Sequence, residues 1–125
     1  MTSHAGMLVF CCQDDDIEAL RAASGTQGPA LYVVDTPVAV THRVVAGRPL
    51  AVFLGVGHKT LEHLDVIPVI HAARPDLPVI VIAEEDSLEL ERKARQKSIF
   101  YYLVHPVDPS EIEAVLKDVL RHLKH

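Results

Sequence analysis

The sequence contains no tryptophan, only two cysteines and no long apolar run, and each of these absences narrows what the chain can be. No apolar stretch approaches the roughly 18–20 residues that a membrane-spanning helix needs, so we expect no membrane partner. The first residues lack a basic segment followed by a long apolar one, so no signal peptide is visible and we expect a cytoplasmic protein. Because the net charge is −5, we expect no direct nucleic-acid partner either.

The two cysteines, Cys11 and Cys12, are adjacent at the end of an apolar run. Neighbouring residues of a strand point to opposite faces, so a disulfide between these two is not expected. Neither belongs to a Cys-x-x-Cys motif, and His122 and His125 have no carboxylate or thiol near them to complete a metal site. We therefore expect no metal and no cofactor.

Five short apolar runs predict five strands, at residues 7–12, 31–35, 50–54, 79–83 and 100–104. The runs are continuous rather than alternating, which is typical of strands covered on both faces of a parallel sheet. The gaps between them are long enough for crossover helices. The order predicts an α/β fold with a doubly wound, five-stranded parallel sheet and helices on both faces. We expect one domain, residues 1–125, with a disordered N-terminus at 1–6.

The last helix has the clearest signals. Asp108 can cap it, Pro109 suits its first position, and Glu111 completes a pattern typical of a capping box. Apolar residues at steps of three and four then extend the prediction to residue 123. Weaker patterns predict helices at 17–24, 37–46, 61–73 and 87–96. Pro68 predicts a kink or a late start in the third of these.

Ligands of doubly wound sheets bind outside the carboxyl ends of the strands, here residues 12–16, 55–59, 83–86 and 105–106. The acidic run at 14–16 could hold Mg²⁺, but we favour helix capping, because Ile17 begins the next apolar pattern at once. Gly55 and Gly57 belong to no phosphate-binding motif, and we expect them to make the loop flexible.

Three segments carry a resemblance to a known family. YLVHPVDP at 102–109 is similar to the YLVKPFDP segment of bacterial response-regulator receiver domains. RPLAVFL at 48–54 and ARPDLPVIVI at 73–82 resemble two further strands of that family. The resemblance covers about residues 7–123, and it implies a flavodoxin-like (βα)5 fold and a role in two-component phosphorelay signalling.

The family's chemistry needs an acidic pair after the first strand, an aspartate that accepts the phosphoryl group, a hydroxyl and a lysine. The acceptor position here is Gly55, the hydroxyl position is Ala83 and the lysine position is His105. The acidic pair falls on residues 11–12 or 12–13. The resemblance therefore implies a degenerate pseudo-receiver without the phospho-acceptor. Its vestigial pocket would consist of Cys12, Gln13, Asp14, Ala83 and His105.

Such a domain is expected to be a non-enzymatic interaction module, whose partner is an output domain, a kinase or another regulator. The family's usual interaction face, which also serves homodimers, corresponds to residues 87–96, 100–104 and 109–123. Tyr102, or its neighbour Tyr101, corresponds to the family's switch aromatic. Tyr101 is either an exposed anchor for a partner or, like Tyr102, a packed side chain.

Three alternatives stay open at this point. Asp14 or Asp15 could accept a phosphoryl group by an unconventional route. Cys12, at the end of the first strand, could act as a phosphocysteine carrier, although the acidic run beside it would repel phosphate. His105 could be a general base or a pH-sensitive group, but we expect a hydrogen-bonded histidine at a strand end.

Overall fold

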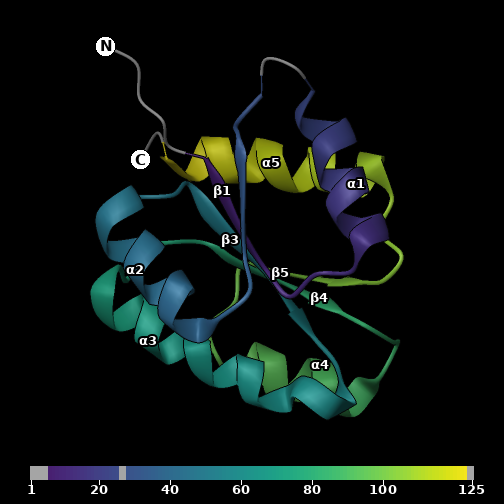
Figure 1. Cartoon of the computed structure of the whole chain (residues 1–125). Helices are drawn as coiled ribbons and strands as arrows, with labels where there is room; N and C mark the ends of the chain where they lie inside the picture. The colour runs from purple at the N-terminus through teal and green to yellow at the C-terminus, as the bar shows by residue number, and fades with distance from the viewer. Residues whose placement is uncertain (1–5, 26–27, 124–125) are drawn as a thin grey trace.

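The computed structural model describes residues 6–25 and 28–123, and its centre is one parallel sheet (Figure 1). The strands are β1 (Met7–Phe10), β2 (Leu31–Val34), β3 (Ala51–Val56), β4 (Val79–Ala83) and β5 (Tyr101–Val104). Their order is β2-β1-β3-β4-β5, and every neighbouring pair is parallel. The predicted α/β fold with a five-stranded parallel sheet is confirmed.

Helices cover both faces of this sheet (Figure 1). One face carries α1 (Asp14–Ser24) and α5 (Pro109–Leu123). The other carries α2 (Pro37–Gly47), α3 (Val66–Ala73) and α4 (Leu88–Arg95). A 3-10 helix, η1 (His58–Asp65), leads from β3 into α3. None of the helices within the described ranges combines the length and apolarity needed to cross a membrane.

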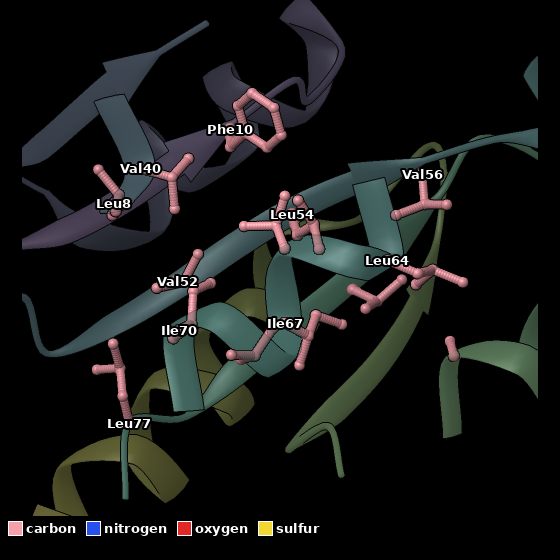
Figure 2. Close-up of a cluster of buried hydrophobic side chains, with 14 of the residues drawn as sticks. Leu8, Phe10, Val40, Val52, Leu54, Val56, Leu64, Ile67, Ile70 and Leu77 are labelled. Carbon is pink, nitrogen blue, oxygen red and sulfur yellow. The ribbon is translucent and has the colours of Figure 1, made fainter. Parts of the chain in front are cut away.

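The core consists of two apolar clusters because alternate residues of a strand point to opposite faces. Leu8, Phe10 and Leu54 point toward α2, α3 and α4, where Figure 2 shows them packed with residues of α2 and α3. Met7 and Phe53 point the other way, toward α1 and α5. Every residue of β1, β3 and β4 is buried, which explains their continuous apolar runs.

The capping residues predicted for the last helix form the expected hydrogen bonds. The Asp108 carboxylate accepts a hydrogen bond from the Ser110 amide at 2.9 Å, and Glu111 accepts one from the Asp108 amide at 3.0 Å. These bonds hold the start of α5. The predicted late start before Pro68 is also confirmed, since α3 begins only at Val66, after η1. Pro68 thus lies in the first turn, where a missing N–H costs no helical bond.

Residues 1–5 of the predicted disordered N-terminus lie outside the described part of the chain. Gly6, the last residue of that prediction, is buried, and its carbonyl oxygen accepts a hydrogen bond from the Leu50 amide at 2.8 Å.

Candidate functional site

The turn after β1 brings its main chain into close contact with β3. β1 ends at Phe10, two residues earlier than predicted, because Cys11 adopts a left-handed backbone conformation with φ 56°. The turn brings the Cys11 carbonyl against Gly55. A Cβ atom added to Gly55 would overlap the Cys11 oxygen and lie 2.7 Å from the Cys11 carbonyl carbon. Main chain therefore occupies the space that any side chain at position 55 would need.

Gly55 is an ordered part of the sheet. It pairs with Ile82 inside β3, and its carbonyl oxygen lies 3.0 Å from Nδ1 of His63, which donates to it. The His63 ring in turn packs 4.8 Å from the Phe10 ring. The expectation that Gly55 serves loop flexibility is wrong, because the glycine is required by the close approach of two backbones.

The acidic run lies within the first turn of α1, which begins at Asp14, three residues earlier than predicted. Carboxylates in a first turn complement the helix dipole, as expected for a capping role. No side-chain cap is formed, however, since the N-cap residue Gln13 makes no capping hydrogen bond. Asp14 and Asp15 are exposed, whereas Asp16 is fully buried.

Asp16 binds the segment that follows β5. Its Oδ2 atom accepts a hydrogen bond from Nδ1 of His105 at 2.8 Å, and its Oδ1 atom accepts one from the Val107 amide at 3.0 Å. The His105 amide also donates to the Ala83 carbonyl at 2.7 Å, and the His105–Pro106 peptide bond is cis. We call these contacts the Asp16–His105–Val107 clamp. His105 is a hydrogen-bonded histidine at a strand end, as expected.

The sequence analysis named Asp16 only as part of the acidic run at 14–16 and did not distinguish it as the buried member of that run. A signal was available, because Asp16, Ala19 and Leu20 are the buried residues of α1, at the spacing of one helical face. The predicted helix began at Ile17 and so left Asp16 out. A helix predicted from Asp14 would have included Asp16 on that face.

The predicted vestigial pocket is only partly assembled. An open depression of about 420 Å³ at the carboxyl end of the sheet is lined by Cys11, Cys12, Gln13, Asp14, Thr60, His63 and Glu84. Three predicted pocket residues are therefore together, but Ala83 and His105 are absent from this lining, and Ala83 is fully buried. Gly57 leaves space for the Glu84 carboxylate, which a Cβ at position 57 would meet.

The charge of this depression disfavours a phosphoryl group, and its side chains are not grouped as metal ligands. Asp14 and Glu84 contribute carboxylates, which repel an anion. Within residues 6–25 and 28–123, no group of three or more His, Cys, Asp or Glu side chains is arranged to hold a metal ion.

The surroundings of the two thiols disfavour their thiolate forms. Burial, followed by the charge of Asp16, raises the pKa of Cys12, whose Sγ atom lies 3.7 Å from the Phe53 carbonyl oxygen. Partial burial and the charges of Asp35 and Glu84 raise the pKa of Cys11. Because the thiolate is the reactive form, these shifts disfavour a phosphocysteine carrier.

The two tyrosines of β5 pack on opposite faces of the sheet, and both are half-buried. The Tyr101 hydroxyl donates a hydrogen bond to Asp118 of α5 at 2.8 Å, and this bond raises the pKa of Tyr101. Tyr102 packs toward α4, with the Arg95 guanidinium 5.7 Å from its ring centroid. The arrangement favours the packed alternative for both side chains over an exposed anchor at Tyr101.

We expect Gly55→Ala to lower the free energy of unfolding by about 1–3 kcal/mol, because the new methyl group meets rigid backbone. The matched control is Gly47→Ala at the end of α2, where the nearest atom would be Arg43 Cδ at 3.6 Å. The control should be neutral or stabilise by up to about 1 kcal/mol. Urea denaturation measures both, and a Gly55→Ala variant as stable as the control would contradict the close approach.

We expect Asp16→Asn to lower the free energy of unfolding by about 1–3 kcal/mol, because an amide weakens two buried hydrogen bonds. Asp15→Asn, one residue away but exposed, should cost less than about 0.5 kcal/mol through the helix dipole. The amide signal of Val107 should shift in the first variant and not in the second. Equal losses of stability would show that the clamp does not form.

No family model matches the sequence. The chain is 35% identical over 114 residues, 89% of its length, to the DNA-binding transcriptional regulator NtrC of Rhizobium meliloti (strain 1021). A second match, to NtrC of Azospirillum brasilense, is 39% identical over 57 residues, 46% of the chain. The chain spans 24% of the first relative and the match covers 12% of the second, so both are much longer proteins.

Solved structures agree on the fold. NtrX from Brucella abortus superposes with a TM-score of 0.80 at 19% identity, covering 96% of this chain and 28% of that one. A CheY-like response-regulator receiver domain protein from Methanospirillum hungatei JF-1 superposes with a TM-score of 0.75 at 16% identity, covering 96% and 97%. The chain therefore has the fold of CheY-like receiver domains, and most of its length is similar in sequence to part of the DNA-binding transcriptional regulator NtrC.

Proposed function

We propose that this chain is an atypical receiver-like signalling module that is not phosphorylated by the aspartate mechanism and acts through protein–protein interaction. The observation that carries the proposal is the contact between the Cys11 carbonyl and Gly55. An acyl phosphate needs a carboxylate side chain at its acceptor position. Glycine offers none, and main chain fills the space in which one would stand.

The other reactive positions support the same reading. Ala83 has no hydroxyl and is fully buried. His105, at the position of the family's lysine, directs Nδ1 to Asp16 instead of into the depression. Asp14 and Glu84 add negative charge where a phosphoryl group would have to be stabilised.

The proposed partner is an output domain, a kinase or another regulator, and a homodimer through α4, β5 and α5 is part of the proposal. Leu88 on α4 is 62% exposed, and Leu120 and Leu123 on α5 are 46% and 43% exposed. Aliphatic side chains of this kind can be buried by a second protein surface. We further propose that the chain is one non-enzymatic domain, located in the cytoplasm and working without metal or cofactor.

A second candidate function is unconventional phosphotransfer through Asp14 or Asp15. It is favoured by one observation, that Asp14 is exposed and lines the depression at the carboxyl end of the sheet. Asp15 is equally exposed in the same helical turn. Either carboxylate would have to take the phosphoryl group without a hydroxyl or lysine to stabilise it.

Incubation with acetyl phosphate and Mg²⁺, followed by intact-mass measurement, tests the proposal. We expect no phosphoryl adduct, whereas a receiver domain with the complete acidic pair, acceptor aspartate and lysine should acquire one under identical conditions. Gly55→Asp should also remain unmodified, because restoring the carboxylate does not restore the space for it.

A phosphoryl adduct on the unaltered chain would overturn the proposal. The Asp14→Asn/Asp15→Asn double variant then decides the alternative. Loss of the adduct in this variant would assign phosphotransfer to the acidic run, and persistence would place the acceptor elsewhere.

A further inference from the structure

A groove of about 400 Å³ lies between η1 and α4, and we call it the η1–α4 groove. One side of its lining belongs to η1, and the other belongs to α4 and the two residues directly after it. The lining consists of Leu61, Glu62, Leu64 and Asp65 on the first side, and Lys93, Gln96 and Lys97 on the second. None of these residues lines the depression at the carboxyl end of the sheet. The volume is within the range of about 300–1,000 Å³ that is typical of small-molecule sites.

The apolar part of the lining comes from two leucines of η1. Leu64 is buried in the core, and Leu61 is half-buried against the same apolar cluster. Their side chains are held by this packing, so an aliphatic group that enters the groove meets an apolar surface that is already ordered.

The four charged residues of the lining are separated by sign. Glu62 and Asp65 lie on the η1 side, and Lys93 and Lys97 lie on the α4 side. Within residues 6–25 and 28–123, no ion pair crosses the groove, and Lys93 pairs instead with Glu89 of its own helix at 3.6 Å. The groove therefore has one acidic and one basic side.

The other ionisable residues of these two elements lie outside the lining. They are His58, Lys59 and His63 on η1, and Glu89, Glu91, Arg92 and Arg95 on α4. Three of them are engaged elsewhere, since Arg95 pairs with Glu91 at 2.8 Å and His63 binds the Gly55 carbonyl oxygen.

α4 is attached to the core by few side chains. Of its eight residues, only Leu90 and Ala94 are buried. Elements with few buried apolar contacts open most easily, so contacts with a ligand would add appreciably to those that hold this helix.

We propose that the η1–α4 groove binds a small zwitterion with an aliphatic body, a free aliphatic amino acid or its dipeptide. The ammonium group would lie beside Glu62 and Asp65, and the carboxylate beside Lys93 and Lys97. The aliphatic side chain would contact the two leucines. This is a ligand-binding function beyond the interaction role proposed above. Because α4 belongs to the proposed partner surface, occupancy of the groove would connect the ligand to that surface.

The separation of charge selects against ligands of a single sign. An anion would be attracted by the two lysines and repelled by the two carboxylates on the opposite side, and a cation would meet the reverse arrangement. A zwitterion gains from both sides at once.

The test titrates the isotopically labelled whole chain with L-leucine and with L-leucyl-L-leucine, followed by amide NMR. We expect saturable shifts in both residues 61–65 and residues 93–97, and the probe that binds more tightly identifies the size of the ligand. Acetylating the amino group of that probe, or converting its carboxylate to an amide, removes one charge. Each of these analogues should bind at least about threefold more weakly, because each loses its ion pairs with one side of the groove.

Matched variants locate the contact. Lys97→Gln and Glu62→Gln should each weaken binding of the zwitterion about threefold, and Lys97→Arg should retain most of it because the charge is kept. The controls Lys117→Gln and Glu113→Gln remove exposed charges from α5 and should bind normally. Urea denaturation of each variant verifies that folding is unchanged, as expected for side chains that are not buried.

Three results would overturn the inference: no saturable shift with either probe, equal binding of the zwitterion and both analogues, or shifts that leave residues 61–65 and 93–97 unaffected. Shifts of these segments with protein concentration alone would assign the groove to a second copy instead. The acetyl phosphate experiment does not involve these residues. Failure of the groove therefore leaves the proposed absence of phosphorylation standing, and the reverse also holds.

Discussion

The contact of the Cys11 carbonyl with Gly55 determines the geometry of the whole carboxyl end of the sheet. Because the main chain turns down onto β3 at this point, β1 ends early and α1 begins at Asp14. That early start places Asp16 on the buried side of α1. From there its carboxylate reaches His105 and the Val107 amide, 89 and 91 residues further along the chain.

The Asp16–His105–Val107 clamp connects this end of the sheet to the start of α5. A buried carboxylate is costly unless it is hydrogen-bonded, and here both oxygens have partners. The His105 side chain, directly after β5, is thus held in a structural hydrogen bond. The depression nearby is lined instead by residues that include Asp14, Glu84 and two thiols of raised pKa. The arrangement supports the proposal that exposed helices, and not the strand ends, carry the interactions of this domain.

The sequence predicted the features that depend on local pattern. Buried runs identified all five strands, and the Asp108, Pro109 and Glu111 signals located α5 because capping acts over three or four residues. The end of β1 and the start of α1 were missed because they depend on the left-handed backbone of Cys11, a non-glycine residue. The role of Gly55 and the pairing of Asp16 with His105 depend on contacts between distant segments, which no local pattern encodes.

The central claim is that the carboxyl end of the sheet is closed at Gly55 and does not form a Mg²⁺-dependent phosphoryl site. A titration of the labelled chain with millimolar Mg²⁺, followed through the amide NMR signals of residues 11–16 and 55, tests this most directly. The account predicts no saturable change in these signals, because three oxygen ligands are not brought together there. A saturable shift of Gly55 and the acidic run at millimolar Mg²⁺ would contradict it.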